Sequence, residues 1–345
     1  MSTGNLSVGL NRSIRPESIT VLVSRAALLG LTLLFGAMTL FGSLPSLETQ
    51  MVIYLVGMVA LNLPHGGYEH FSNLRYRGLP FGSKYVLLYI TAIAAFIALF
   101  LIVPLIALAI AFATAVAKGG HGDLRVMDAV VGSSHLQSRL QRSLAAFVRG
   151  GAVMIVPLYF FPDTYYMFSA YMLAMFDPGL SSALWASMET SRPLLAGLYA
   201  VAVLTHLGWG LVTAGVSSSW LADLGETSLL VGFFAIVPVV VSIGLYFPLW
   251  YSMRQSGRSA YVHRETADED DGLPVPVVWG TFIVGAFATG IMAALLWTIA
   301  PNPLGNAGLL PGLVAFYTIF ICIVALPHVV VGEWLDVDRG IWYVP

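Results

Sequence analysis

Apolar runs of about 20 residues follow one another along almost the whole chain. A helix needs roughly 20 apolar residues to cross the hydrocarbon core of a bilayer. Hydrophobic residues make up 58% of the 345 residues and charged residues only 10%, against about a quarter in soluble proteins. Long continuous runs, in place of alternating segments of about ten residues, argue against a transmembrane β-barrel. The sequence therefore predicts an all-α, polytopic transmembrane helical bundle.

The runs with the composition of membrane-spanning helices lie at residues 19–43, 50–66, 84–102, 104–118, 144–161, 193–216, 228–252, 275–300 and 309–331. Pro104 is expected to mark a tight turn between two of them. A weaker run over 165–176 has about 12 residues, which is short for a full crossing. With no soluble domain and no internal repeat, we expect a single integral membrane domain over 1–345 with about 8–10 membrane passes. A polar tail at 1–18 and a charged loop at 254–274 complete it.

Arginine and lysine in short loops predict the orientation. The basic residues of the N-terminal tail and of the second and fourth loops are Arg12, Arg15, Arg75, Arg77, Lys84, Lys118, Arg125, Arg139, Arg142 and Arg149. If the N-terminus is cytoplasmic, these loops are cytoplasmic too. The loop with Arg254, Arg258 and Arg264 joins them only if the run at 165–176 crosses or re-enters the membrane. We favour that topology, which describes a multi-pass protein of the cell membrane with a cytoplasmic N-terminus.

Three further features limit the function classes. The first apolar run, near 19–41, is too long for the core of a signal peptide, so no cleavable signal is expected. The chain has no basic stripe, so no nucleic-acid partner is expected. Few charged residues lie inside the runs and no repeat is apparent, which disfavours a transporter. The single cysteine, Cys322, lies in an apolar run and is predicted to be a small core residue.

Histidines are the side chains best able to carry chemistry here, because ionisable groups in membrane segments are costly and usually functional. His65 lies in Leu63–Pro64–His65–Gly66–Gly67–Tyr68–Glu69–His70. Glu69 shares a helix face with His65 if the helix continues, whereas His70 is rotated away. The two glycines would let a helix or a ligand approach the backbone closely. Metal ligation is the favoured interpretation of His65.

His121 follows Gly119–Gly120, His206 lies within an apolar run, and His328 is near the end of the last run. In the favoured topology, the histidine of the Pro-His-Gly-Gly segment lies at the same cytoplasmic end as His121 and His328. Together they could form a metal site between helices, and imidazole suits iron, zinc or copper. For His206 and His328, a hydrogen bond to a backbone carbonyl or a neighbouring helix is the favoured alternative. His135 and His263 belong to polar segments, and we expect both to be solvated.

These motifs together resemble those of a known family. Leu63–Pro64–His65–Gly66 followed by Glu69–His70 resembles the Pro-His-Gly-x-x-Asp-His signature of the Brp/Blh family of membrane dioxygenases, which split beta-carotene centrally into two retinals. His121–Gly122–Asp123–Leu124 resembles the family's second motif, His-Phe-Gly-x-x-Asp, in shortened form. Glu226–Thr227 leads into a segment that ends at Trp250 and resembles the family helix ending in Tyr-Phe-x-x-Trp-His-Ser-x-x-His. Leu326–Pro327–His328 resembles the C-terminal helix, so the likeness runs from about residue 50 to the end.

One position pair departs from the family. Tyr251 and Gln255 stand where the family has two histidines. The resemblance implies a ferrous ion, Fe(2+), held by four histidines, of which this chain keeps His65 and His121. A tyrosine phenolate favours ferric iron and a glutamine oxygen is a weak ligand, so the loss of two imidazoles should weaken metal binding. The candidates for compensating ligands, or for groups that orient the ligands, are Glu69, His70, His206 and His328.

The resemblance implies an oxygenase that uses O2 to cleave beta-carotene at its central double bond and gives two retinal molecules. No catalytic residue is expected beyond the metal ligands. The surrounding lipid would supply the carotene, and an opsin is a candidate acceptor of retinal. Lys84 and Lys118 lie at helix ends, so a retinal Schiff base within this chain is not expected. The alternative is a non-catalytic carotenoid- or retinal-binding accessory protein that has lost part of the iron site.

Overall fold

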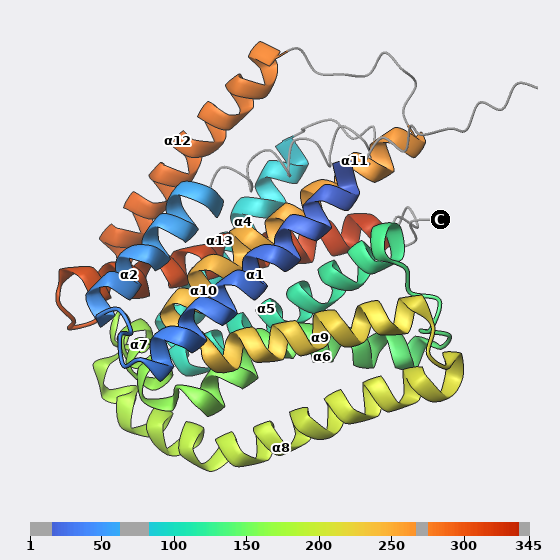
Figure 1. The fold of residues 1–345 in the computed structure, drawn as a ribbon. Helices are drawn as coiled ribbons and strands as arrows, with labels where there is room; N and C mark the ends of the chain where they lie inside the picture. Colours follow the sequence, from blue (N-terminus) through green and yellow to red (C-terminus); the bar gives the residue numbers. More distant parts are fainter. Residues whose placement is uncertain (1–15, 63–82, 267–274, 338–345) are drawn as a thin grey trace, which may run out of the picture.

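The computed structural model describes residues 16–62, 83–266 and 275–337, and within these ranges the chain forms helices and no strand. Figure 1 shows the helices packed into one bundle. Five are long and apolar enough to cross a membrane, over Ser18–Leu40, Pro104–Val131, Arg139–Phe160, Pro178–Ala214 and Ser218–Ile236. Shorter apolar helices cover Leu47–Ala60, Val86–Ile102, Ile283–Ile299 and Leu309–Val324. The predicted all-α polytopic bundle is confirmed.

The α-helices are α1 (Pro16–Leu40), α2 (Leu47–Leu55), α4 (Ser83–Ile102), α5 (Pro104–Val126), α6 (Arg139–Phe160), α7 (Pro162–Ala174), α8 (Ser181–Ala214), α9 (Ser218–Ile236), α10 (Val239–Tyr246), α11 (Met253–Thr266), α12 (Val275–Ile299) and α13 (Leu309–Val337). The short 3-10 helix η3 covers Pro178–Leu180, and three π-helical segments are η1 (Val56–Asn62), η2 (Met127–Val131) and η4 (Phe247–Ser252). The predicted turn at Pro104 is confirmed, because α4 ends at Ile102 and Pro104 starts α5. Proline suits this first position, where its missing N–H has no helical partner to lose.

The apolar run predicted over 228–252 is wrong as a single segment. It contains the end of α9, a break at Val237–Pro238, and the start of a second rod made of α10, η4 and α11. Pro238 takes the N-cap position of α10, and proline disfavours continued helix in the residue before it. Hydropathy stays high across the break, so the hydropathy pattern alone did not reveal it.

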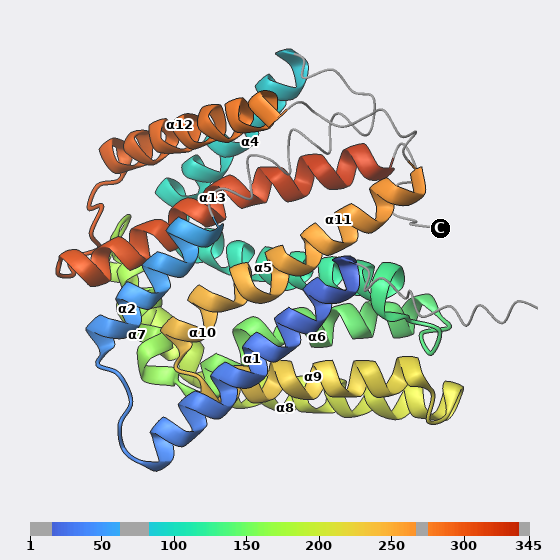
Figure 2. The same cartoon turned by 45° about the horizontal axis from the view of Figure 1, so that its top comes forward.

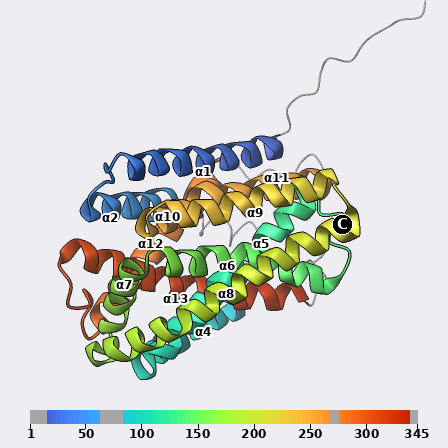
Figure 3. The same cartoon turned by 60° about the horizontal axis from the view of Figure 1, so that its bottom comes forward.

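Contacts with α1 show that α9 and the rod made of α10, η4 and α11 run in opposite directions. Arg25 of α1 pairs with Glu226 of α9, and Gly36 faces Ile236 at the end of α9, so these helices are parallel. A β-carbon on Gly257 of α11, however, would meet Thr20 near the start of α1. In Figure 2, α1 lies between α9 and the α10–α11 rod, and Figure 3 shows α1 beside both.

This reversal corrects the predicted topology. Because the chain reverses at Pro238, α11 lies at the end of the bundle where α5 ends. The arginines of 254–264 therefore reach that end without a membrane crossing at 165–176. The run at 165–176 forms α7, whose 13 residues span about 20 Å, less than the hydrocarbon core. The predicted charged loop at 254–274 is also wrong over its first part, because α11 continues to Thr266.

Helices α5 and α6 pack with their backbones in close approach. A β-carbon at Gly120 would overlap the carbonyl oxygen of Ala146, and one at Gly150 would overlap that of Val116. Only glycine lets the two backbones approach this closely. Lipid supplies no hydrophobic drive between helices, so small residues and polar contacts favour such packing in membranes. The pair carries His121, which is exposed, on α5 and the buried Arg149 on α6.

Candidate functional site

The structure brings the second and third family-like motifs together. A β-carbon on Gly122 of α5 would lie 2.8 Å from a ring carbon of Tyr251, 2.9 Å from the amide nitrogen of Gln255 and 3.0 Å from the Tyr251 hydroxyl. Gln255 is buried and Tyr251 is half-buried. The side chains of Tyr251 and Gln255 therefore pack directly against Gly122, the glycine next to His121.

Irregular backbone flanks each of these motifs. Segment η1 ends at Asn62, just before the Pro-His-Gly-Gly sequence, η2 follows the His121 turn, and η4 contains Tyr251. Segment η1 packs on η4, and α11 packs on both α5 and η2. π-helical turns are rare and are found frequently at functional sites. Their position supports a functional interpretation of the α5–α11 contact.

The remaining predicted site residues are only partly placed. His65, Glu69 and His70 lie outside the described residues. His328 lies on α13 and His263 on α11, in stretches where the structure describes the backbone and not the side chains. The role of His65 and His121 as metal ligands, with help from Glu69, His70 or His328, therefore stays a prediction.

The described donors do not by themselves complete an iron site. They are the phenol of Tyr251 and the amide of Gln255, which pack on Gly122, and the imidazole of the neighbouring His121, whose side chain is exposed. The ammonium of Lys118 lies 5.9 Å from the centre of the Tyr251 ring. Within the part of the chain that the structure describes, no group of three or more His, Cys, Asp or Glu could hold a metal ion. A ferrous ion at this contact would need ligands beyond these described donors.

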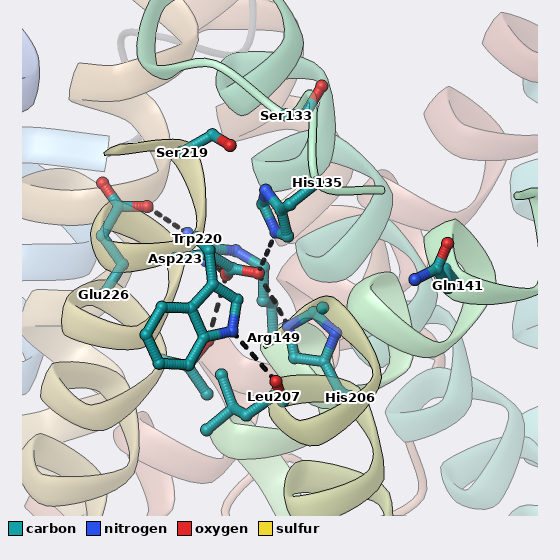
Figure 4. Close-up of polar contacts among 12 residues, drawn as sticks. Ser133, His135, Gln141, Arg149, His206, Leu207, Ser219, Trp220, Asp223 and Glu226 are labelled. Atoms are coloured by element: carbon teal, nitrogen blue, oxygen red, sulfur yellow. Dashed lines mark hydrogen bonds and ion pairs between the residues drawn. The ribbon is translucent and has the colours of Figure 1, made fainter. Parts of the chain in front are cut away.

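A buried network of charged side chains lies directly behind this contact. Arg149 of α6 donates from Nε to Asp123 at 2.6 Å and from Nη1 to Asp223 at 2.7 Å, and its Nη2 donates to Glu226. The most exposed of these side chains is Asp123, at 3%. Figure 4 shows Arg149 reaching the two acidic residues of α9. Since Asp123 is two residues beyond His121, the network begins at the motif itself.

A second arginine joins the network from α11. Arg254 donates to both carboxylate oxygens of Glu226, at 2.7 and 3.0 Å, and its Nε lies 2.9 Å from Asp123. Its guanidinium stacks 4.2 Å from the centre of the Trp250 ring. Arg25 of α1 adds a contact to Glu226 at 2.7 Å. The charges of these arginines balance those of the carboxylates, as a buried cluster requires.

The prediction that His135 is solvated is wrong. Its side chain is fully buried, and its Nε2 lies 2.8 Å from Oδ2 of Asp223. The Nε2 of His206 lies 2.8 Å from the same oxygen, so both imidazoles flank one carboxylate (Figure 4). The local sequence does not reveal this burial, because the partner of His135, Asp223, is 88 residues away. The alternative that placed His206 in an ordinary polar contact is consistent with this position.

Other members of the network were also missed. The predicted loop position of Arg149 is wrong, because the residue lies within α6 and is 1% exposed. Arg25 and Arg149 both fall inside predicted apolar runs, and a charge inside such a run is the signal that marks a functional or paired group. Asp223 lies before the apolar run predicted at 228–252, so it is not a charge inside an apolar run and the sequence does not mark it as functional or paired. The scarcity of charge inside the helices was therefore overestimated.

The chain matches known proteins over nearly its whole length. Residues 56–336 match the family described as beta-carotene 15,15'-dioxygenase. A protein of Halobacterium salinarum named probable beta-carotene 15,15'-dioxygenase Brp is 50% identical over 336 residues, which cover 94% of each chain, in both strain R1 and strain NRC-1. A second protein of strain NRC-1, probable beta-carotene 15,15'-dioxygenase Blh, is 31% identical over 244 residues and 64% of each chain. No solved structure matches the chain.

Proposed function

Because the chain belongs to the beta-carotene 15,15'-dioxygenase family, we propose that it uses dioxygen to cleave beta-carotene at its central double bond and gives two molecules of retinal. The observation that carries the proposal is the family match over residues 56–336, with 50% identity to the Brp protein across 94% of both chains. That range includes every motif segment named above.

The outer surface of the bundle suits an apolar substrate. Large apolar side chains such as Leu33, Leu204, Val212 and Phe287 are 65–85% exposed, and an apolar surface of this extent belongs in lipid and not in water. Beta-carotene is an apolar rod of about 30 Å, comparable with the thickness of the hydrocarbon core. The substrate enters from the bilayer and retinal returns to it, where an opsin would take it up. The protein is a multi-pass protein of the cell membrane, with its N-terminus in the cytoplasm.

The chemistry is centred on the contact between α5 and α11. His65 and His121 are the proposed ligands of a ferrous ion, which would supply the dioxygen chemistry when bound. Tyr251 and Gln255 pack on Gly122, where they would orient the substrate beside the ligands. The roles assigned to this chain's own residues are therefore binding and orientation.

A second candidate function is a non-catalytic protein that binds carotenoid or retinal. The observation that favours it is the ammonium of Lys118, 5.9 Å from the Tyr251 ring at a position where the family has a metal ligand. A positive charge this close repels a metal cation, and the repulsion is strong in a site of low dielectric constant. Such a protein would hold the pigment and deliver it to an opsin or to an intact oxygenase.

The deciding experiment measures retinal by chromatography in cells that accumulate beta-carotene. The intact chain, a His65→Ala variant and a His263→Ala control would be expressed to the same level beside an active family member. We expect retinal from the intact chain and the control, and none from His65→Ala. Well-expressed protein that yields no retinal, beside a working family member, would refute the oxygenase. Co-purification of carotenoid in that case would support the binding protein.

A further inference from the structure

The buried charges meet the proposed site at two points. Asp123 is the neighbour of Gly122 on α5, and Arg254 is the neighbour of Gln255 on α11. These two side chains contact each other, with 2.9 Å between Nε of Arg254 and Oδ1 of Asp123. Arg254 also stacks on Trp250, the residue before Tyr251. The contact between Asp123 and Arg254 thus links the Gly122 segment of α5 directly to the segment of α11 that carries Gln255.

We propose that Arg254, held between Asp123 and Glu226, is a positioning residue that sets the register of α11 against α5. In this role it places Tyr251 and Gln255 over the Gly122 turn and leaves the reacting groups to others. The inference deepens the proposed function and rests on it. Its physical content, the register between two helices, is measurable without any activity.

Helix packing in lipid explains why register needs a polar device. Helices in a bilayer gain no hydrophobic free energy from contacting each other, so a smooth interface resists sliding only weakly. On the other side of α11, Gly257 has no side chain and packs against the side chain of Thr20 of α1. A charged pair inside the bundle permits one register, since a shift of one turn would leave a buried charge unpaired.

Arginine is chemically suited to this position and lysine is not. The planar guanidinium of Arg254 reaches Glu226 through Nη1 and Nη2 and Asp123 through Nε, while its face lies on Trp250. Lysine carries the same charge as a single point and cannot make this fork or stack in the same way. Arg254→Lys therefore keeps the positive charge and removes the two-pronged contact with Glu226, the contact with Asp123 and the stacking on Trp250.

A proton relay is the other role that a chain of buried charges can have. Relays in membrane proteins use aspartate, glutamate and histidine, which gain and lose protons. Here Arg149 separates Asp223, with its two histidines, from Asp123, and arginine does not release its proton in proteins. The network therefore holds charges in place and does not conduct protons.

The first test compares Arg254→Lys with Arg142→Lys. Arg142 pairs with Asp128 in a partly exposed contact between α6 and the end of the α5 rod, so it is a matched control outside the site. The yield of monodisperse protein in detergent, kcat and KM for beta-carotene are measured for each. We expect Arg254→Lys to lower kcat on the order of 100-fold, because a misplacement of about 1 Å has that effect. KM changes by about twofold or less, and Arg142→Lys behaves as the parent. An unchanged kcat per folded Arg254→Lys molecule would overturn the proposal.

The second test measures the register itself. Lys118→Cys and Tyr251→Cys are combined in a Cys322→Ala background, since Lys118 faces Tyr251 across the contact. Short bifunctional thiol reagents then cross-link the pair in membranes, with and without Arg254→Lys. We expect efficient cross-linking that falls with Arg254→Lys, and an unchanged yield would overturn the positioning role. If the parent makes no retinal, the proposed function fails, while the cross-link still decides the register.

Discussion

Replacement of Gly122 by alanine is the sharpest perturbation of the α5–α11 contact. The added β-carbon would lie 2.8 Å from a Tyr251 ring carbon, where ordinary contact begins at 3.4 Å. The two helices must therefore separate locally by about 0.6 Å, or Tyr251 and Gln255 must leave their rotamers. Because both side chains meet the same β-carbon, a movement of only one of them does not relieve the overlap.

The magnitude follows from two opposing terms. Overpacking of a well-packed contact costs about 1–3 kcal/mol, whereas alanine gains about 1 kcal/mol over glycine inside a helix. The net loss of stability is therefore small, about 0–2 kcal/mol. A displacement of this size at a reacting centre lowers kcat roughly 10- to 100-fold. We expect activity to fall far more than stability.

Gly119→Ala is the matched control one turn earlier on α5. Its β-carbon would meet the Tyr246 hydroxyl at 3.6 Å and Cα of Gly150 at 3.8 Å, which is ordinary contact. This variant should gain stability by about 0.5–1 kcal/mol and keep its activity. The assay measures retinal formation per folded molecule and thermal unfolding in detergent. A Gly122→Ala protein as active as Gly119→Ala would refute the view that the α5–α11 contact carries the chemistry.

Two further predictions concern the site and the network behind it. The double variant Tyr251→His with Gln255→His should raise the iron content of the purified protein and its activity, measured by elemental analysis and retinal yield. Unchanged iron content would mean that these positions do not face the metal. Asp223→Asn should destabilise the fold by about 3–5 kcal/mol, because it removes one of the three carboxylates that neutralise the buried arginines and the only one that contacts both imidazoles. Asp128→Asn, in a partly exposed ion pair, should cost about 0–1 kcal/mol. Equal unfolding temperatures for the two variants would contradict the importance of the buried network.

The motif residues were recognisable in the sequence, but their surroundings were not. The resemblance of His121–Gly122–Asp123 to a family motif drew attention to a turn that packs against Tyr251 and Gln255. The same sequence gave no sign that Asp123 meets both Arg149 and Arg254. A motif records which residue types a short segment needs, and it carries no distance to side chains elsewhere in the chain.

Some of the missed features had a signal that hydropathy averaging hides. Pro238 interrupts a run of high hydropathy, and a break at proline is readable from its chemistry. Arg149 falls within an apolar run, where a charge demands a partner. An average over about 20 residues suppresses both, since one proline or one arginine changes it little.

The sequence by itself determined the all-α membrane fold, because every backbone group in lipid must find its partner within its own helix. That requirement is local, so apolar runs and Pro104 were enough to locate most helices. Only the tertiary structure decided which charges meet. His135 is bound to Asp223 and not to water, and Arg254 joins Asp123 to Glu226, across separations of 28 to 131 residues. Pairing at such distances depends on where the folded helices cross, and no local pattern specifies that.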